Sequence, residues 1–288
     1  MIEKQSSFPL LFLFVILISF TSCIINENIE DTSIKVDPGN DPNFEIIANY
    51  EKNFEVFNRK VIVFDIPLYA FEAVEDSKLL HAANILAQYL DNNEDGTVDN
   101  TTVHNAMKSN KAFVFLWKTS TERDAFNQPA GYIGQSIGAD TVIPVWHTNG
   151  HVGDFDNSLK TLWHSITNTG YQKAYPNVFG PLATSEIGIA MNVARGGNFP
   201  NPPANYPASA WFTNTTPSCN YTCQVNEYLY WIMSSILGAQ ENRITDIGNE
   251  WSLNTSIKVQ TDDVKAWTIF SNTTYSLPSI LPDGGYKQ

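Results

Sequence analysis

The sequence predicts an α+β fold, with a small β-sheet in the first half of the chain and mostly helices in the second. Runs of β-branched and aromatic residues lie before residue 147, and apolar residues at helical spacing dominate beyond about residue 155. In addition, 43% of the 288 residues are hydrophobic, which is enough to bury one substantial core. We therefore expect a single domain over residues 44–288.

The first half alternates predicted strands with short helices. Residues 54–71, 111–117 and 141–146 are rich in β-branched and aromatic residues and are predicted to form strands. Residues 76–90 carry apolar side chains at helical spacing. Residues 101–110 begin with threonines suited to capping a short helix.

Helical patterns dominate the second half. They cover residues 155–169, 184–195, 224–240 and 261–271. The last begins TDDVKAW, in which a threonine would cap the helix and two acids would lie at the positive end of its dipole. The Pro-, Gly- and Asn-rich stretch over residues 196–211 is predicted to be a loop with embedded aromatic residues.

The N-terminus is typical of an exported bacterial lipoprotein. An apolar run over residues 9–20 follows a lysine and is too short for a comfortable transmembrane helix. FTSC, residues 20–23, resembles the lipobox at which such proteins are cleaved and acylated; an ordinary signal peptide is the alternative. We expect residues 1–22 to be a signal peptide, Cys23 to carry lipid such as palmitate, and residues 23–43 to be a polar tether. The chain would then be anchored in the outer membrane or at the surface of a Gram-negative bacterium.

Charge and cysteine content narrow the partners. The formal net charge is −13, so nucleic acid is not an expected partner, because phosphate binding depends on clustered Lys and Arg. If Cys23 carries lipid, Cys219 and Cys223 remain, in CNYTC. A pair in an exported chain predicts a disulfide. A two-cysteine metal site is the weaker alternative, because the stretch shows no further ligands.

A calcium loop is predicted directly after the helix at 76–90. YLDNNEDGTVDN, residues 89–100, matches the D-x-N-x-D-G-x-x-D core of an EF-hand loop spanning residues 91–102. The predicted ligands are Asp91, Asn93, Asp95, Thr97 through its carbonyl, and Asp99. Thr102 stands where such loops carry a bidentate Glu, which predicts weakened affinity. The alternative is a merely solvated acidic turn.

The histidines suggest a second metal site. His81 and His104 are interpreted as structural, whereas His147 and His151 are spaced H-x3-H across an Asn-Gly turn. His164 shares a helical stripe with Thr161 and Asn168. A zinc hydrolase would place ligands and a general base on such a stripe, but two of these three positions carry neutral groups that bind zinc poorly.

The chain resembles a sparsely described family of secreted calcium-loop proteins with a helical, metallohydrolase-like half. The resemblance rests on the segments HAANILAQYLDNNEDGTVDN, LWHSITNTGYQKAYPNVFG, AMNVARGG, NEYLYWIMSSILGAQ, EWSLNT and LPDGGY. In that family the helix reads E-x-x-H-x-x-x-H and AMN reads AMD. The resemblance therefore implies a degenerate site here, with Thr161, Asn168 and Asn192 in place of acid, histidine and acid. Only His164 would remain, with Glu227 as a helper.

A structural interpretation of the same residues is also open. A histidine beside Trp163 on an amphipathic helix is most often a hydrogen-bonded core residue. Glu227 would then cap its helix or pair with Arg195. The sequence contains no G-x-S-x-G nucleophile motif and no phosphate-binding loop.

Aromatic residues suggest a glycan partner. Seven Trp and twelve Tyr are many for this length, and exported glycan-binding proteins stack sugars on exposed rings. The loop with Phe199, Tyr206, Trp211 and Phe212 is the predicted platform, although aromatic residues also fill helical cores. The favoured hypothesis is a non-catalytic, calcium-binding lipoprotein that handles polysaccharide. The alternative is a zinc-dependent hydrolase centred on His164, with His147, His151 or Glu227 completing the site.

Overall fold

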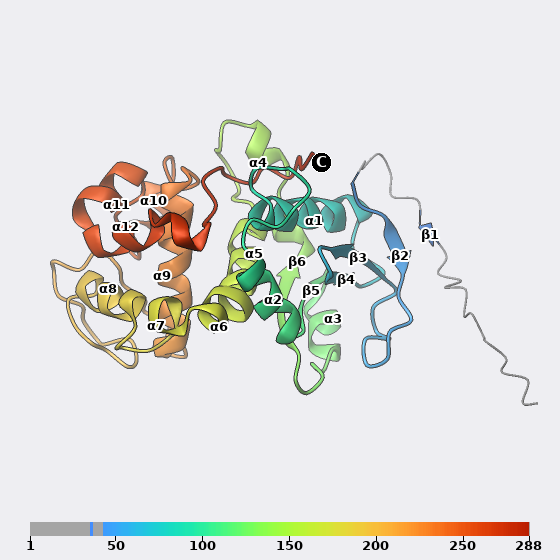
Figure 1. Cartoon of the computed structure of the whole chain (residues 1–288), viewed down its shortest axis with the longest axis horizontal. Helices are drawn as coiled ribbons and strands as arrows, with labels where there is room; N and C mark the ends of the chain where they lie inside the picture. The colour runs from blue at the N-terminus through green and yellow to red at the C-terminus, as the bar shows by residue number, and fades with distance from the viewer. Residues whose placement is uncertain (1–34, 37–42, 288) are drawn as a thin grey trace, which may run out of the picture. The chain divides into compact units, whose positions relative to one another are not determined.

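The first half of the chain builds a mixed β-sheet. The computed structural model describes residues 35, 36 and 43–287, the first two through their backbone alone. The predicted signal peptide, Cys23 and most of the predicted tether lie outside the described residues. Within these limits the sheet has six strands in the order β1-β2-β3-β4-β5-β6 (Figure 1). They are β1 (Lys35–Val36), β2 (Ile46–Ala48), β3 (Arg59–Val63), β4 (Ile66–Ala70), β5 (Ala112–Trp117) and β6 (Ile133–Gly138).

The sheet changes direction between β4 and β5. Strands β1 to β4 pair antiparallel, whereas β5 and β6 run parallel to β4. Parallel neighbours need a crossover connection, and here α1 (Asp76–Leu90), a loop and α2 (Thr101–Ser109) form it. The short helix α3 (Ser120–Ala125) links β5 to β6. The predicted helix at 76–90 is confirmed with the same limits, and the predicted calcium loop lies within the crossover.

The two faces of the sheet are covered differently. Phe113 and Phe115 contact rings from outside the sheet, among them Phe54, Phe57 and Phe126. Side chains alternate along a strand, so the intervening buried residues of β5 face the other side, on which α1 and α5 (Ser158–Ile166) pack. Both faces are therefore buried, which suits the parallel part of the sheet.

The second half of the chain is helical, which confirms the predicted α+β class. Its α-helices after α5 are α6 (Gln172–Ala174), α7 (Pro176–Phe179), α8 (Glu186–Ala194), α9 (Tyr221–Ile236), α10 (Ile244–Ile247), α11 (Ser256–Asp262) and α12 (Val264–Phe270). A π-helical stretch, η2 (Thr167–Tyr171), extends α5. Helix α9 contacts α5, α8 and α11, and Trp163 Nε1 donates to the carbonyl of Leu229 at 3.2 Å. Figure 1 shows α8 to α12 gathered around α9.

The predicted strand at 141–146 is wrong, and strands β2 and β6 were not predicted from the sequence. Residues 139–148 instead form a 3-10 turn, η1 (Ala139–Thr141), and the short helix α4 (Val145–Thr148). Pro144 precedes α4, and proline is poorly tolerated within a sheet. Strand β6 reads IGQSIG and lacks an apolar run because the ring of Phe113 occupies the space beside Gly134, where a Cβ would come within 2.1 Å.

The predicted helix at 261–271 is divided. Asp263 ends α11 and caps α12, where its carboxylate accepts from the N–H of Ala266 at 3.2 Å. Thr255, not Thr261, caps the preceding helix. Asp263 is 2% exposed and also accepts from Trp211 Nε1 and Tyr228 Oη. A buried aspartate with three donors therefore sets the break.

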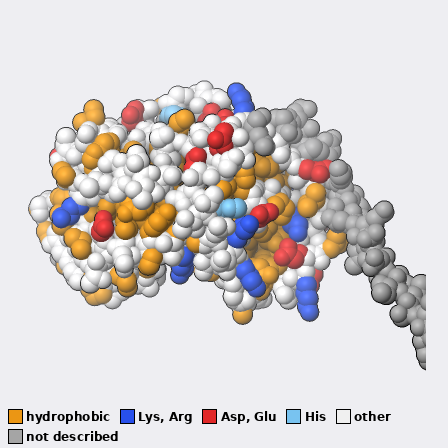
Figure 2. All heavy atoms as spheres, viewed as in Figure 1, with side chains coloured by type: hydrophobic (Ala, Val, Ile, Leu, Met, Phe, Trp, Pro, Cys, Tyr) orange, Lys and Arg blue, Asp and Glu red, His pale blue; other side chains and the backbone are white. Residues whose placement is uncertain are grey.

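The surface is mixed in charge over the sheet. On the face shown in Figure 2, Lys and Arg side chains stand among Asp and Glu side chains, as in the ion pair of Lys108 with Asp65 at 3.0 Å. In the part of the chain that the structure describes, no helix combines the length and the apolar character needed to cross a membrane.

Candidate functional site

The predicted calcium loop is folded around its first residue. Asp91 is fully buried, and its carboxylate accepts from the backbone N–H of Asp95 at 3.1 Å and of Gly96 at 2.8 Å. Gly96 turns the chain at φ +86°, a conformation that favours glycine. Asp99 accepts from the N–H of Asn92 at 2.7 Å and closes the loop. The structure thus places the predicted ligands in one tight turn between two helices: Asp91, Asn93, Asp95, Thr97 and Asp99.

Four carboxylates share this turn and repel one another: Asp91, Glu94, Asp95 and Asp99. Burial raises the pKa of Asp99, the charges of Asp91 and Asp95 raise it further, and a hydrogen bond from the N–H of Asn92 opposes them. A dication would relieve the repulsion, and the carboxylate, amide and carbonyl oxygens present are ligands that calcium prefers. The residue types therefore suit calcium, and an ion would have to draw the loop carboxylates closer together than the 4.8 Å ligand spacing that they do not meet here. Thr102 is exposed in the first turn of α2 and offers no carboxylate.

A segment near the C-terminus, residues 276–287, crosses this loop and the end of α1. Gln88 Oε1 accepts from the N–H of Asp283 at 2.9 Å and of Gly284 at 2.8 Å. The hydroxyl of Tyr286 donates to Asp91 Oδ2 at 2.6 Å. These bonds fix the crossing segment to the helix that leads into the loop, a contact that the sequence does not predict.

Two adjoining grooves open between the crossing segment and its neighbours. The first, of about 250 Å³, is lined by Asn92, Asn93, Asp99, Ser276, Leu277, Ser279 and Ile280. The second, of about 410 Å³, is lined by Ile236, Trp267, Phe270, Ser271, Asn272, Thr273, Ser276, Leu277, Pro278 and Ser279. The two share Ser276, Leu277 and Ser279 as lining residues, and the second includes the half-buried ring of Trp267. We call the two together the loop groove.

Of the predicted aromatic platform, Phe212 is turned inward and the other three residues are half-buried. Phe212 is fully buried, so it cannot offer a face to a sugar. Trp211 is half-buried, with its Nε1 bonded to Asp263 at 2.9 Å. Phe199 and Tyr206 contact each other edge to face. The platform prediction is therefore wrong for Phe212, and the loop groove is the better-formed surface.

The structure brings His164 and Glu227 together only loosely. His164 Nε2 is buried without a hydrogen-bond partner and lies 3.9 Å from Glu227 Oε1. Glu227 pairs with Lys160 at 2.8 Å rather than with Arg195, as the structural interpretation had it. Burial, with the charge of Lys160, lowers the pKa of His164 to about 4, against the opposing charge of Glu227.

The neighbours expected to complete a zinc site do not join His164. Among the described residues, no third His, Cys, Asp or Glu comes within ligand spacing of His164 and Glu227. Asn168 lies in the π-helical stretch beyond α5, and Asn192 Oδ1 accepts from Arg195 Nη2 at 2.7 Å. The residues present at His164 therefore do not fit the predicted zinc site.

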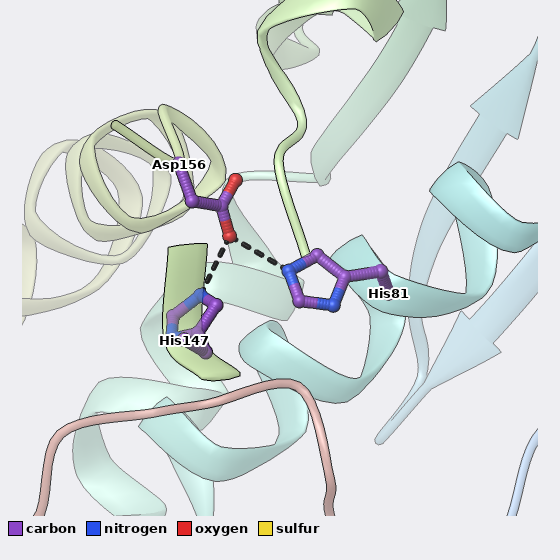
Figure 3. Close-up of side chains that lie close together, drawn as sticks. All are labelled: His81, His147 and Asp156. Atoms are coloured by element: carbon purple, nitrogen blue, oxygen red, sulfur yellow. Dashed lines mark hydrogen bonds and ion pairs between the residues drawn. The ribbon is translucent and has the colours of Figure 1, made fainter. Parts of the chain in front are cut away.

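A different cluster gathers two of the remaining histidines. His81 on α1 and His147 on α4 point toward Asp156, which precedes α5 (Figure 3). Their Nε2 atoms lie 2.7 and 2.8 Å from Asp156 Oδ2, and Asp156 is fully buried. Burial alone would raise the pKa of Asp156, but the hydrogen bonds with His147 and His81 outweigh it and hold the pKa well below the usual range of a carboxyl group.

Some of the polar atoms around this cluster have hydrogen-bond partners and others do not. Asp156 Oδ1 accepts from the N–H of Ile143 at 3.1 Å and of Ser158 at 3.2 Å. In contrast, Nδ1 of His147 is buried and has no hydrogen-bond partner. His151, the other half of the predicted H-x3-H pair, stacks on Trp146 with ring centroids 4.4 Å apart and does not reach Asp156.

The crossing segment also approaches the cluster. A Cβ on Gly284 would lie 2.2 Å from Nδ1 of His81, and Gly284 adopts φ +81°, so only glycine fits. Burial raises the pKa of Asp283, but hydrogen bonds from Gln88 and the N–H of Gly285, with the nearby charge of His147, bring the pKa below its usual value.

Sequence reasoning did not predict the contact between His81 and Asp156. Asp156 follows His147 by nine residues, which was a usable local signal. His81 lies 75 residues before Asp156 on an apolar helix, and no spacing rule connects them. Only the packing of α1 against α5 joins the two.

Cys219 and Cys223 are joined by a disulfide, the pairing that the sequence favours. The bond closes a short loop at the start of α9. Its residues contribute nothing to the clusters above.

Comparison with models of known protein families, with curated proteins and with solved structures gives no match. The functional argument therefore rests on the geometry of the loop, the loop groove and the histidine clusters.

Proposed function

We propose that this chain is an exported, lipid-anchored protein that binds carbohydrate, without catalysing a reaction, in a groove beside a calcium-stabilised loop. The observation that carries the proposal is the loop groove, which is lined by Asn93 and Asp99 of the loop and by the ring of Trp267. The export signal and the anchor at Cys23 are supported by the N-terminal sequence.

The lining of the loop groove suits a sugar chain. Half of its lining residues carry amides or hydroxyls, including Asn93, Asn272 and Thr273, and these groups can exchange hydrogen bonds with sugar hydroxyls. The half-buried ring of Trp267 offers an apolar face with a polar edge, which suits the apolar faces of pyranose rings. A few polar groups around an aromatic anchor are typical of small-ligand sites.

Calcium would act here by holding the groove in shape. Asn92 Oδ1 accepts from the N–H groups of Ser279 and Ile280, at 2.8 Å each, so this loop residue fixes one wall of the groove. Without a cation, the four loop carboxylates repel one another and the loop is destabilised. Sugar affinity should therefore depend on calcium, although the ion need not touch the sugar.

The test is titration calorimetry of the full chain against a panel of soluble polysaccharides, with calcium or with a chelator. We expect binding in calcium that weakens in chelator, and Trp267→Ala should weaken it by about tenfold or more. Trp117→Leu is the matched control, because Trp117 is also half-buried but contacts Arg123 away from the groove. Equal affinities for the wild type and Trp267→Ala would contradict the proposal.

The contribution of the loop is tested separately by Asp95→Asn. Asp95 is exposed and keeps its shape as asparagine, so the change removes a predicted ligand charge with little effect on packing. Calcium at about a hundred times its dissociation constant should raise the unfolding free energy by about 2.7 kcal/mol in the wild type. The gain should shrink strongly in Asp95→Asn. An equal gain in both proteins would show that calcium acts elsewhere.

A further inference from the structure

We propose that His81, His147 and Asp156 form a binding site for a transition-metal dication of the zinc type. Among the described residues, this is the only group of three or more His, Cys, Asp or Glu side chains whose potential ligand atoms all lie within 4.8 Å of one another. The site is separate from the calcium loop and from the loop groove, so it goes beyond the function proposed above.

The ligand types select the class of metal. Two imidazole nitrogens and one carboxylate oxygen suit zinc and its neighbours, whereas calcium and magnesium prefer oxygen throughout. Three protein ligands also leave one tetrahedral position open for water or another ligand. With three protein ligands and one open coordination position, the cluster differs from structural zinc sites, in which the protein supplies all four ligands.

The distances allow a metal after a small adjustment. Zinc binds nitrogen and oxygen at about 2.0–2.2 Å, so two tetrahedral ligand atoms stand about 3.3 Å apart. Here the two Nε2 atoms lie 2.7 and 2.8 Å from Asp156 Oδ2. Each histidine would therefore withdraw by about half an ångström, which a small side-chain rotation provides. During this movement the backbone N–H groups of Ile143 and Ser158 would hold the carboxylate of Asp156 in place through its Oδ1.

The two imidazoles converge on one carboxylate oxygen, an arrangement that a single cation between the three groups would produce. The site is also enclosed, because the side chain of His147 is only 2% exposed.

The crossing segment covers the site. The backbone of Gly284 lies against the His81 ring, and Figure 3 shows the salmon ribbon of the C-terminal part passing the cluster. A larger residue at this position would push the segment away from His81. The site is thus partly shielded from solvent, which strengthens the binding of a cation to a buried carboxylate.

The test is titration of the full chain with zinc in the presence of saturating calcium, followed by cobalt substitution. We expect one equivalent of zinc and, with cobalt, the visible absorption of a low-coordinate nitrogen–oxygen site. His147→Gln and Asp156→Asn should each weaken zinc binding by about a hundredfold or more. His164→Gln is the matched control, because His164 is another buried histidine beside a carboxylate that lacks a third ligand.

Two results would overturn the assignment: unchanged zinc affinity in His147→Gln and Asp156→Asn, or loss of affinity in His164→Gln. If a ligand variant unfolds, NMR of the unchanged chain decides, because zinc should shift the ring resonances of His81 and His147 but not of His164. Shifts confined to other histidines would refute the site. Sugar titration of the same samples keeps this result separate, since Trp267→Ala should leave zinc affinity unchanged.

Discussion

Two clusters in this protein place histidine beside a buried carboxylate, and they differ in what the carboxylate does. Asp156 accepts both His81 and His147 at hydrogen-bond distance. Glu227 instead pairs with Lys160 at 2.8 Å, and His164 remains 3.9 Å away. Histidine and a carboxylate are therefore in hydrogen-bond contact at Asp156 but not at Glu227.

The difference shows that a neighbouring lysine can prevent a carboxylate from pairing with a histidine. A carboxylate that already pairs with an ammonium group offers less attraction to a neighbouring imidazole. At Asp156, the other oxygen is held by backbone N–H groups, which orient the carboxylate without neutralising it. Three changes would sharpen or remove this contrast.

The largest effect is expected from Asp156→Asn. This substitution leaves two buried imidazoles facing an amide, so we expect a loss of about 3 kcal/mol of unfolding free energy. Glu227→Gln, the corresponding change in the other cluster, should cost only about 1 kcal/mol, because Lys160 remains partly solvated. Urea denaturation of both variants measures the difference. Equal losses would mean that Asp156 is no more central than Glu227.

Acid should destabilise the protein through His164. Burial lowers the folded-state pKa of His164 to about 4, whereas an unfolded histidine titrates near 6.5. Between these values the unfolded state binds more protons, so the unfolding free energy falls as the pH falls, by up to about 3 kcal/mol. His164→Gln lacks this component. Denaturation at several pH values from 7 to 4 should show a shallower decline for His164→Gln, and parallel curves would refute the argument.

The smallest effect is expected from Lys160→Met. The charge of Lys160 lowers the pKa of His164 and the charge of Glu227 raises it, both in addition to burial. Removing the ammonium should move the pKa of His164 back toward its ordinary value, a change worth roughly 1 kcal/mol. An NMR titration of the His164 ring measures this directly. No movement would show that distance alone, rather than Lys160, separates the pair.

Local features of this fold could be predicted from the sequence. The helix at 76–90 depends on apolar spacing, and the loop after it depends on alternate residues within one turn, so both are written in contiguous residues. Strand β6 could not be predicted in this way. The ring of Phe113 on the neighbouring strand leaves no room for a side chain at Gly134, and this contact is not visible in the local sequence. Asp263 divides a continuous helical pattern for a similar reason, since its donors Trp211 and Tyr228 come from distant segments.

The candidate sites follow the same rule. The predicted calcium ligands share one loop, whereas the His81 and Asp156 pairing requires α1 to pack on α5. The predicted stripe of Thr161, His164 and Asn168 assumes a continuous α-helix, but the α-helix ends at Ile166 and a π-helical stretch follows. Spacing arguments therefore hold only as far as the element itself is regular.

The crossover of α1, the predicted calcium loop and α2 bears on how the chain folds. Strand β5 can pair with β4 only after this long connection has closed on itself, and closing it restricts the freedom of every residue between them. A cation held in the loop would shorten the flexible part of that connection before the strands meet. Calcium should therefore increase the refolding rate of the protein, and not merely slow its unfolding.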